Sequence, residues 1–325
     1  MSERAKRMVA SLFFRLLHQD PSRYERQFLR PDGRSFYNER FAIVLQAFFT
    51  GYNSGLRTEL SVREIRTELD QRFDPFYRGF AYEGLGMGLA ARSDVIRKGR
   101  LTFEYDIRQI DPGYIYQYYV GLGWWLHTRY RYRSEKYRRR LAVLHPHFAL
   151  IIYDGVGFKT GLFHKADITM AIDRFSRFAP DEQRVCWQGF GRSLWFLNQF
   201  DSEQTVQAVG RLPSSVRADV YSGVGLAIAY SAFDYPDWPA HARSLVEPVY
   251  HPAFDQGLAF GWETRRLQNR PYYQQMLAGY PAGLPEQIEQ MVAAVHTARQ
   301  RVSEITSSEL FYSRWIDETR RLLTI

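Results

Sequence analysis

The sequence has very little cysteine and lacks any long run of uncharged apolar residues. Cys186 is the single cysteine of the 325 residues, which excludes an internal disulfide framework and is typical of a protein from the reducing cytoplasm. No apolar run reaches about 18 residues, so no membrane span is expected. The opening stretch, MSERAKRMVASLFFRLLHQD, lacks a small-residue cleavage site, so no secretory signal is expected either. These absences predict a cytoplasmic protein.

The composition is that of a folded, basic protein. Apolar residues make up 45% of the chain and aromatic residues 16%, which excludes an intrinsically disordered chain. The net charge of +8 has its densest source in RYRYRSEKYRRR at 129–140. Arginine and tyrosine so mixed can hold phosphates and stack on bases, but no recognised nucleic-acid motif accompanies them. We therefore interpret this run as a solvated helix face and expect no nucleic-acid partner.

A short glycine motif recurs along the whole chain. Its copy at 221–229, YSGVGLAIA, loosely matches the G-x-G-x-x-G/A turn that binds dinucleotides. The first glycines of the copies are Gly51, Gly84, Gly121, Gly155, Gly189, Gly223 and Gly257. Their successive spacings are 33, 37, 34, 34, 34 and 34 residues. A constant spacing near 34 residues is typical of helix–turn–helix repeats, not of phosphate-binding loops.

Proline precedes most of these glycines by nine or ten residues. The prolines are Pro75, Pro112, Pro146, Pro180 and Pro213. Proline is favoured at the first helical position, and Asp74 and Asp111 stand where an N-cap is needed. A helix is therefore predicted to begin at each proline, with the glycines in its middle. Glycine in mid-helix costs about 1 kcal/mol relative to alanine, so its repeated use requires a packing reason.

The helical wheel supplies that reason. Two glycines separated by one residue lie about 160° apart, on opposite flanks of a helix, where each allows a neighbouring helix to approach. The apolar residue between them marks the core face. Segments 165–175 and 202–212 are long enough for shorter return helices. We predict an all-α fold, a TPR-like α-solenoid of about seven units of ~34 residues enclosing a channel, although the tetratricopeptide consensus itself is absent.

One face of each long helix remains, comprising the residue before the first glycine and the residue three after it. It carries Glu83, Met87, Trp124, Asp154, Phe158, Gln188, Arg192, Ser222, Leu226, Gln256 and Phe260, with His127 and Trp195 nearby. This mixture of aromatic, aliphatic and scattered polar groups suits a long ligand channel with a few orienting groups. The same pattern is also expected of a half-buried inner wall that binds nothing.

The chain shows no motif that names a reaction. The histidines lack metal-ligand spacing, and neither a nucleophile elbow nor a P-loop is present, so no metal and no cofactor are predicted. Cys186 falls on the core side of its helix. Glu83 and Asp154 can act as an acid/base pair, orient a ligand, or pair with Arg192, and these three are the candidate catalytic residues if the protein is an enzyme. Arg192 is the best candidate for holding a carboxylate or enol at one end of a ligand.

Several blocks in order resemble one bacterial family. They are FYRGFAYEGLGMGLA (76–90), ALIIYDGVGFKTGLFH (149–164), WQGFGRSLWF (187–196), YSGVGLAIAYSA (221–232) and FDQGLAFGWETR (254–265). The resemblance covers residues 38–270 and is to a once-uncharacterised domain family that recurs in enediyne natural-product gene clusters. It implies an all-helical homodimer whose channel holds a linear polyene or fatty-acid-like chain. The protein would solubilise, protect or pass on that chain, in transient contact with a polyketide synthase or a downstream enzyme.

The sequence also predicts how the chain is organised around the repeats. Residues 1–36 are expected to hold an N-terminal amphipathic helix or cap, with Met8, Leu12, Phe13, Leu16 and Leu17 at helical spacing. Residues 37–282 form the repeat domain, and 283–325 form capping or dimerisation helices, with one helix at 285–305. All belong to one compact unit.

Three functions remain open at this point. The first is a binding or carrier protein for a long unsaturated chain. The second is an enzyme that cyclises or tailors that polyene. The third is a scaffold that presents a concave helical surface to a partner protein.

Overall fold

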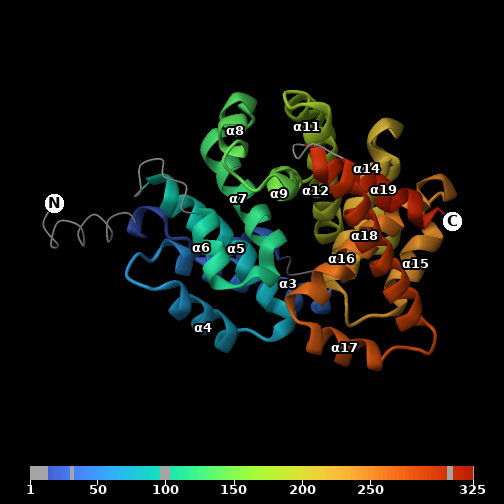
Figure 1. Ribbon diagram of the computed structural model, residues 1–325, viewed down its shortest axis with the longest axis horizontal. Coiled ribbons are helices and arrows are strands. Elements are labelled where there is room, and N and C mark those ends of the chain that lie inside the picture. Colours follow the sequence, from blue (N-terminus) through green and yellow to red (C-terminus); the bar gives the residue numbers. More distant parts are fainter. Residues whose placement is uncertain (1–13, 30–32, 96–102, 306–309, 325) are drawn as a thin grey trace, which may run out of the picture. The chain divides into compact units, whose positions relative to one another are not determined.

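The computed structural model describes residues 14–29, 33–95, 103–305 and 310–324. Within these ranges the chain forms helices and connecting turns and no β-strand, which confirms the all-α prediction (Figure 1). Within the same residues no helix is both long and apolar enough to cross a bilayer. The chain divides into two compact units, Met1–Arg129 and Tyr130–Ile325, called unit 1 and unit 2 below.

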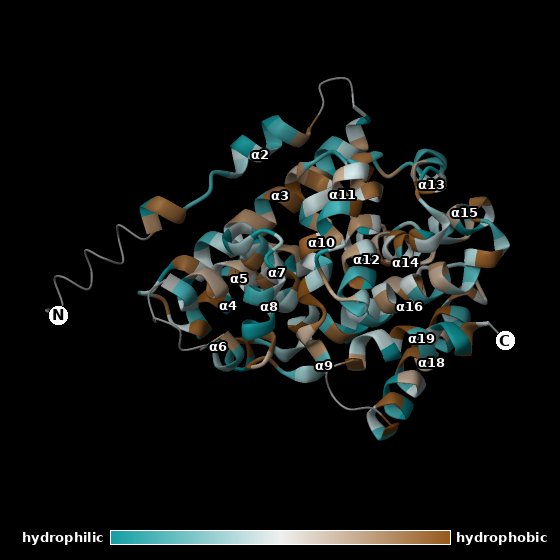
Figure 2. Ribbon diagram, turned by 90° about the horizontal axis from the view of Figure 1, so that it is seen from above, coloured by the Kyte–Doolittle hydropathy of each residue, from teal (hydrophilic) through white to brown (hydrophobic). Residues whose placement is uncertain are grey.

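Unit 1 is built around long helices with shorter helices between them. Its elements are α2 (Pro21–Phe28), α3 (Ser35–Leu56), α4 (Val62–Arg72), α5 (Pro75–Val95), α6 (Phe103–Ile110), the 3₁₀ turn η1 (Pro112–Tyr114) and α7 (Ile115–Tyr130). The long helices α3 and α5 pack against each other. Figure 2 shows α3 coloured mainly as hydrophobic and α2 mainly as hydrophilic. A capping box between Ser61 and Glu64 begins α4, and Asp74 accepts a hydrogen bond from the Phe76 N–H at the start of α5.

Unit 2 continues the alternation of long and short helices. Its elements are α8 (Ser134–Leu141), α9 (Pro146–Ala149), α10 (Ile152–Phe163), α11 (Ile168–Phe175), α12 (Pro180–Leu197), α13 (Ser202–Gly210), α14 (Ser214–Ser231), α15 (Asp237–Leu245), η2 (Pro248–Tyr250), α16 (His251–Gln268), α17 (Arg270–Ala278), α18 (Leu284–Ile305) and α19 (Phe311–Leu323). The helices α10, α12, α14 and α16 pack in succession. The short helices α11 and α13 lie where the sequence predicted return helices.

The predicted helix starts are right at some prolines and wrong at others. Pro75 and Pro180 begin α5 and α12, and Pro213 is the residue before α14. Pro112 instead begins the 3₁₀ turn η1, and Pro146 begins the short α9, so that α10 starts only at Ile152. The cause is local: the Ile151 N–H binds the Phe148 carbonyl and the Tyr153 N–H binds the Leu150 carbonyl, which are the tighter bonds of a 3₁₀ turn.

The glycines perform the packing role that the wheel predicted. A Cβ at Gly189 of α12 would overlap the backbone carbonyl of Asp154 in the preceding helix α10. A Cβ at Gly191, on the opposite flank, would overlap the carbonyl of Val220 in the following helix α14. Glycine is therefore required on both flanks of α12, because the neighbouring backbones lie where side chains would stand.

The apolar residue between the two glycines of α12, Phe190, lies on a third side of the helix, which faces the short helix α11. Phe190 and Trp187 of α12 make edge-on ring contacts with Phe175 of α11, with centroids 6.3 and 4.9 Å apart. Cys186 is buried as predicted, and burial raises the pKa of its thiol well above the ordinary value. These ring contacts place part of the core of unit 2 between long and short helices. The face of α12 that carries Phe190 is therefore occupied by packing against α11.

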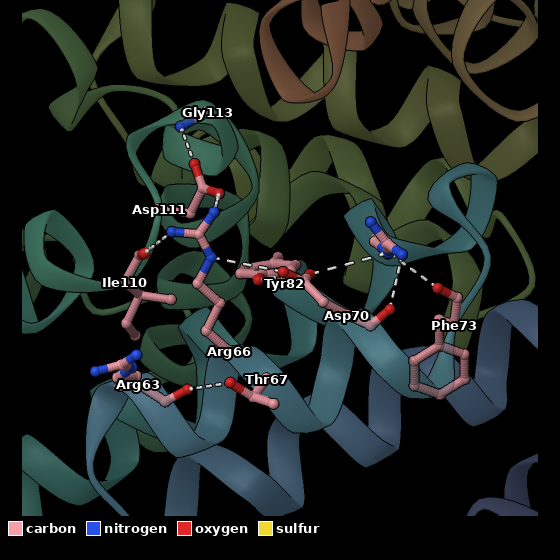
Figure 3. A network of polar contacts seen from close by, with 10 residues as sticks. Arg63, Arg66, Thr67, Asp70, Phe73, Tyr82, Ile110, Asp111 and Gly113 are labelled. Carbon is pink, nitrogen blue, oxygen red and sulfur yellow. Dashed lines mark hydrogen bonds and ion pairs between the residues drawn. The ribbon is translucent and has the colours of Figure 1, made fainter. Parts of the chain in front are cut away.

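A satisfied polar network joins three elements of unit 1 (Figure 3). We call it the α4 network: Arg66, Asp70, Arg78, Tyr82 and Asp111. Arg66 Nη2 lies 2.9 Å from Asp111 Oδ2, and the Tyr82 hydroxyl donates to Asp70 Oδ1 at 3.0 Å. Arg78 donates to the Asp70 carbonyl at 2.7 Å. These contacts attach α4 to α5 and to η1.

The terminal predictions have different outcomes. Of the amphipathic helix predicted within residues 1–36, residues 1–13 lie outside the described residues, and the helical turn that follows them ends at Leu17. The Leu17 carbonyl accepts a hydrogen bond from the Tyr52 hydroxyl of α3 at 3.0 Å. At the other end, α18 confirms the helix predicted at 285–305, and it packs on α16 and α19.

Candidate functional site

The predicted wall residues of unit 1 lie on α5 and α7 and are buried. Glu83 and Met87 flank the point where α5 meets α7, because a Cβ at Gly121 would overlap the Glu83 carbonyl and lie 2.7 Å from the Met87 nitrogen. On α7, the Trp124 ring packs 4.7 Å from the Phe48 ring. His127 is also buried. These side chains form an aromatic and apolar face with two polar members.

In unit 2 the residues that precede the first glycines form a row. We call Asp154, Gln188, Ser222 and Gln256 the polar row; they lie on α10, α12, α14 and α16. Their register is fixed by the glycines, since a Cβ at Gly223 would overlap the Gln188 carbonyl and a Cβ at Gly257 the Ser222 carbonyl. All four side chains are buried. Buried polar groups at corresponding positions of successive helices are not explained by core packing alone.

At one end of the row, Asp154 pairs with Arg192. The Arg192 guanidinium hydrogen-bonds to Asp154 Oδ1, and its charge lies 4.7 Å from the centre of the Phe158 ring. Burial raises the pKa of Asp154, and the charge of Arg192 opposes that shift. The pairing of Asp154 with Arg192 was one alternative from the sequence, and it is confirmed. Arg192 therefore already faces a carboxylate of this chain.

Farther along the row, two carboxamides are held through their oxygens. The Tyr312 hydroxyl donates to Gln188 Oε1 at 3.3 Å. Gln256 Oε1 accepts from the Ser222 hydroxyl at 2.8 Å and from Arg320 Nε at 3.2 Å. Tyr312 and Arg320 both belong to α19, so the C-terminal helix contacts the row directly.

Apolar side chains accompany the polar row on the same helices. Phe158 makes an edge-on contact with Phe196, and Phe260 packs 4.5 Å from Trp315 of α19. Leu226 is partly exposed. A face that combines aromatic rings with a few fixed hydrogen-bonding groups has the chemistry of a site for a long, mostly apolar molecule.

Comparison with known proteins gives one match. A family model described as a protein of unknown function, DUF1702, matches residues 9–321. The chain belongs to the DUF1702 family. No curated protein and no solved structure matches it.

The structure of this DUF1702 protein gives Trp195 a different neighbourhood from the polar row. Trp195 lies about two turns beyond Gln188 on α12. Its indole N–H donates to the Ser231 hydroxyl at 3.0 Å, and its ring packs edge-on against Trp238. These contacts are those of a packing residue near the ends of α12 and α14.

Sequence reasoning missed Lys159 and the residues of α19. Lys159 is partly buried on α10, near Phe163, and burial together with the charge of Arg131 lowers its pKa to about 7. It is the one charged residue in GVGFKTGLF, and that isolation was the available signal. Tyr312 and Arg320 gave no signal, because they lie 124 and 64 residues from their partners Gln188 and Gln256.

The described residues of the DUF1702 chain place its candidate catalytic groups in separate units. Asp154 and Arg192 meet in unit 2, whereas Glu83 belongs to unit 1. Among the residues that the structure describes, no group of three His, Cys, Asp or Glu side chains is arranged to hold a metal ion.

Proposed function

We propose that this DUF1702 protein binds a long hydrophobic molecule and carries or protects it. The ligand is a linear polyene or a fatty-acid-like polyketide intermediate of enediyne natural-product biosynthesis. The observation that carries the proposal is the register of the helix faces in unit 2 that bear the polar row, called the inner face below. On these faces of α10, α12, α14 and α16, buried polar groups recur at corresponding positions, accompanied by aromatic side chains. A long chain with little polarity is complementary to such a face.

The architecture proposed for this function is a TPR-like array of about seven helical hairpins around a channel. The glycine contacts on both flanks of α12, and the alternation of long and short helices, support it. The sequence blocks add a resemblance to the polyene-binding protein of the dynemicin pathway. The protein would then act as a cytoplasmic homodimer and meet a polyketide synthase or a downstream enzyme transiently.

Titration with cis-parinaric acid, a linear polyene that fluoresces in apolar surroundings, tests the proposal. Saturable fluorescence enhancement is expected. Phe158→Ala and Phe260→Ala should each weaken binding about five- to tenfold, because each removes an aromatic contact surface. Val143→Ala, at an exposed site outside the inner face, is the matched control and should bind as the wild type does. The absence of saturable binding would contradict the proposal.

A second candidate is an enzyme that cyclises or tailors the same polyene. One observation favours it: burial raises the pKa of Asp154, which favours proton exchange by this carboxyl group near a face suited to polyenes. A changed carbon skeleton in the ligand recovered from wild-type protein, and an unchanged one from Asp154→Asn, would support catalysis. Recovery of an unchanged polyene from both supports carriage.

A further inference from the structure

Three hydrogen-bonding atoms of the polar row have no partner among the described residues. They are Asp154 Oδ2, Gln188 Nε2 and Gln256 Nε2. Their residues are 2%, 1% and 0% exposed. A buried polar atom without a partner is unfavourable by about 1–3 kcal/mol, so such atoms mark positions that a ligand or a water molecule completes. Three of them on one row of corresponding positions point to a site.

The charges along the row are already balanced. Arg192 faces Asp154, and Arg320, which donates to Gln256, lies 2.9 Å from Asp219. Each of these arginines therefore has a carboxylate partner within the chain. A buried anionic ligand would have to separate one of these pairs, whereas a neutral ligand would not.

The groups left over define the chemistry of that neutral ligand. The two carboxamide nitrogens are donors, and Asp154 Oδ2 is an acceptor when ionised. Arg320 fixes the orientation of Gln256, because its Nε can only donate and would lose its acceptor if the amide turned. Gln188 accepts from the Tyr312 hydroxyl through its oxygen. The side chains are thus held with their N–H groups available, which suits an oxygen acceptor.

The C-terminal helix α19 contacts the polar row at two of its residues, Gln188 and Gln256. Tyr312 binds Gln188, and Arg320 binds Gln256. Trp315, which lies between Tyr312 and Arg320 on α19, packs on Phe260 of α16. Figures 1 and 2 both show α19 beside α16. Apolar rings and donor groups therefore alternate along one buried surface.

We propose that the polar row binds a neutral oxygen, a ketone or a hydroxyl, carried by the long apolar chain. Gln188 on α12 and Gln256 on α16, with α14 between them, each donate an N–H group to one such oxygen, and Asp154 on α10 accepts from an oxygen that is a hydroxyl. This inference rests on the proposed function and narrows its ligand from a plain hydrocarbon or a fatty acid to an oxygenated, uncharged chain.

Displacement of the fluorescent hydrocarbon diphenylhexatriene by three matched competitors tests the inference. The competitors are dodecane, dodecan-2-one and dodecanoic acid. The concentration of each competitor is expressed as a fraction of its own aqueous solubility at pH 7.5. On this scale dodecan-2-one should displace the probe about three- to tenfold better than dodecane, which is the effect of one or two buried hydrogen bonds. Dodecanoic acid should show no advantage over dodecan-2-one.

A pair of variants separates ligand binding from stability. Gln188→Met keeps the length of the side chain and removes the amide, so the advantage of the ketone should fall by about threefold or more. Tyr312→Phe removes the same Tyr312–Gln188 hydrogen bond and leaves the amide in place, so the ketone should keep its advantage. Dodecane should displace the probe equally well from both variants.

The outcomes separate this inference from the proposed function. If all competitors bind but the ketone has no advantage over dodecane, water fills the row and the inference is overturned while the proposed function stands. A clear preference for dodecanoic acid overturns it as well. If neither diphenylhexatriene nor any competitor binds, the proposed function itself fails.

Discussion

The α4 network of unit 1 and the polar row of unit 2 are both groups of polar side chains that join several helices. They differ in how completely they are satisfied. In the α4 network each side chain has a partner, and Arg66 and Asp70 are 49% and 31% exposed. In the polar row the side chains are buried, and three of their atoms are left without partners among the described residues. The first arrangement attaches helices, whereas the second leaves binding capacity unused.

The same comparison predicts very different energies. Exposed ion pairs contribute little to stability because water screens them, whereas removing one member of a buried pair leaves an uncompensated charge. Variants of the two regions therefore give a ranked set of tests.

The largest effect is expected at the buried pair. Asp154→Leu removes the Asp154 carboxylate from the buried Arg192 guanidinium and should lower the free energy of unfolding by about 3–5 kcal/mol. The double variant Asp154→Leu/Arg192→Met removes both charges and should recover most of that loss. Urea unfolding of the two variants measures this. Equal losses in the single and the double variant would contradict the account.

The next effect concerns the close approach of the long helices. Gly223→Ala places a methyl group against the Gln188 carbonyl and should lower the free energy of unfolding by about 1–3 kcal/mol. Gly210→Ala is the matched control, because no atom lies within 4 Å of the added Cβ. It should be neutral or stabilising by up to about 1 kcal/mol. Thermal unfolding of both distinguishes them, and similar losses at the two sites would be the wrong result.

A pH dependence is expected from Lys159. Burial lowers its pKa from 10.5 to about 7, so between these values the unfolded chain binds a proton that the folded chain does not. The free energy of unfolding therefore falls as the pH decreases from 10.5 toward 7. Lys159→Met should flatten this part of the curve and exceed the wild type in stability near pH 7. Urea unfolding at several pH values checks it, and parallel curves would argue against a buried amine.

The smallest effect is expected in the α4 network. Arg66→Gln removes an exposed guanidinium from Asp70 and Asp111 and should lower the free energy of unfolding by about 0.2–1 kcal/mol. The difference from the wild type should shrink further in high salt. Unfolding at low and high ionic strength measures both. A loss as large as that of Asp154→Leu would erase the distinction between the two regions.

The parts predicted correctly from the sequence are those set by local pattern. The glycine spacing predicted helices that approach on two flanks, and α12 bears this out at Gly189 and Gly191. The spacing also placed Asp154, Gln188, Ser222 and Gln256 at corresponding positions. The broken starts before α7 and α10 were missed, because a proline favours a 3₁₀ turn as readily as an α-helix.

The polar contacts of the row were harder to predict. For Arg192 the sequence left two alternatives open, a carboxylate or enol of a ligand and a pair with Glu83 or Asp154. The structure shows the pair with Asp154, 38 residues away in sequence. The contribution of α19 depends on the chain returning to cover α12 and α16, and no local pattern encodes that return. The existence and register of the helices can therefore be read from the sequence here, whereas the choice among long-range partners cannot.

The most direct measurement is the recovery of the ligand itself. The protein should be produced beside an iterative polyketide synthase of an enediyne gene cluster, purified, examined for absorbance and extracted with solvent. We expect polyene absorbance that follows the protein through purification, and an extract containing a linear, unchanged long chain. A protein that emerges from polyene-producing cells without absorbance and without an extractable chain would contradict the account.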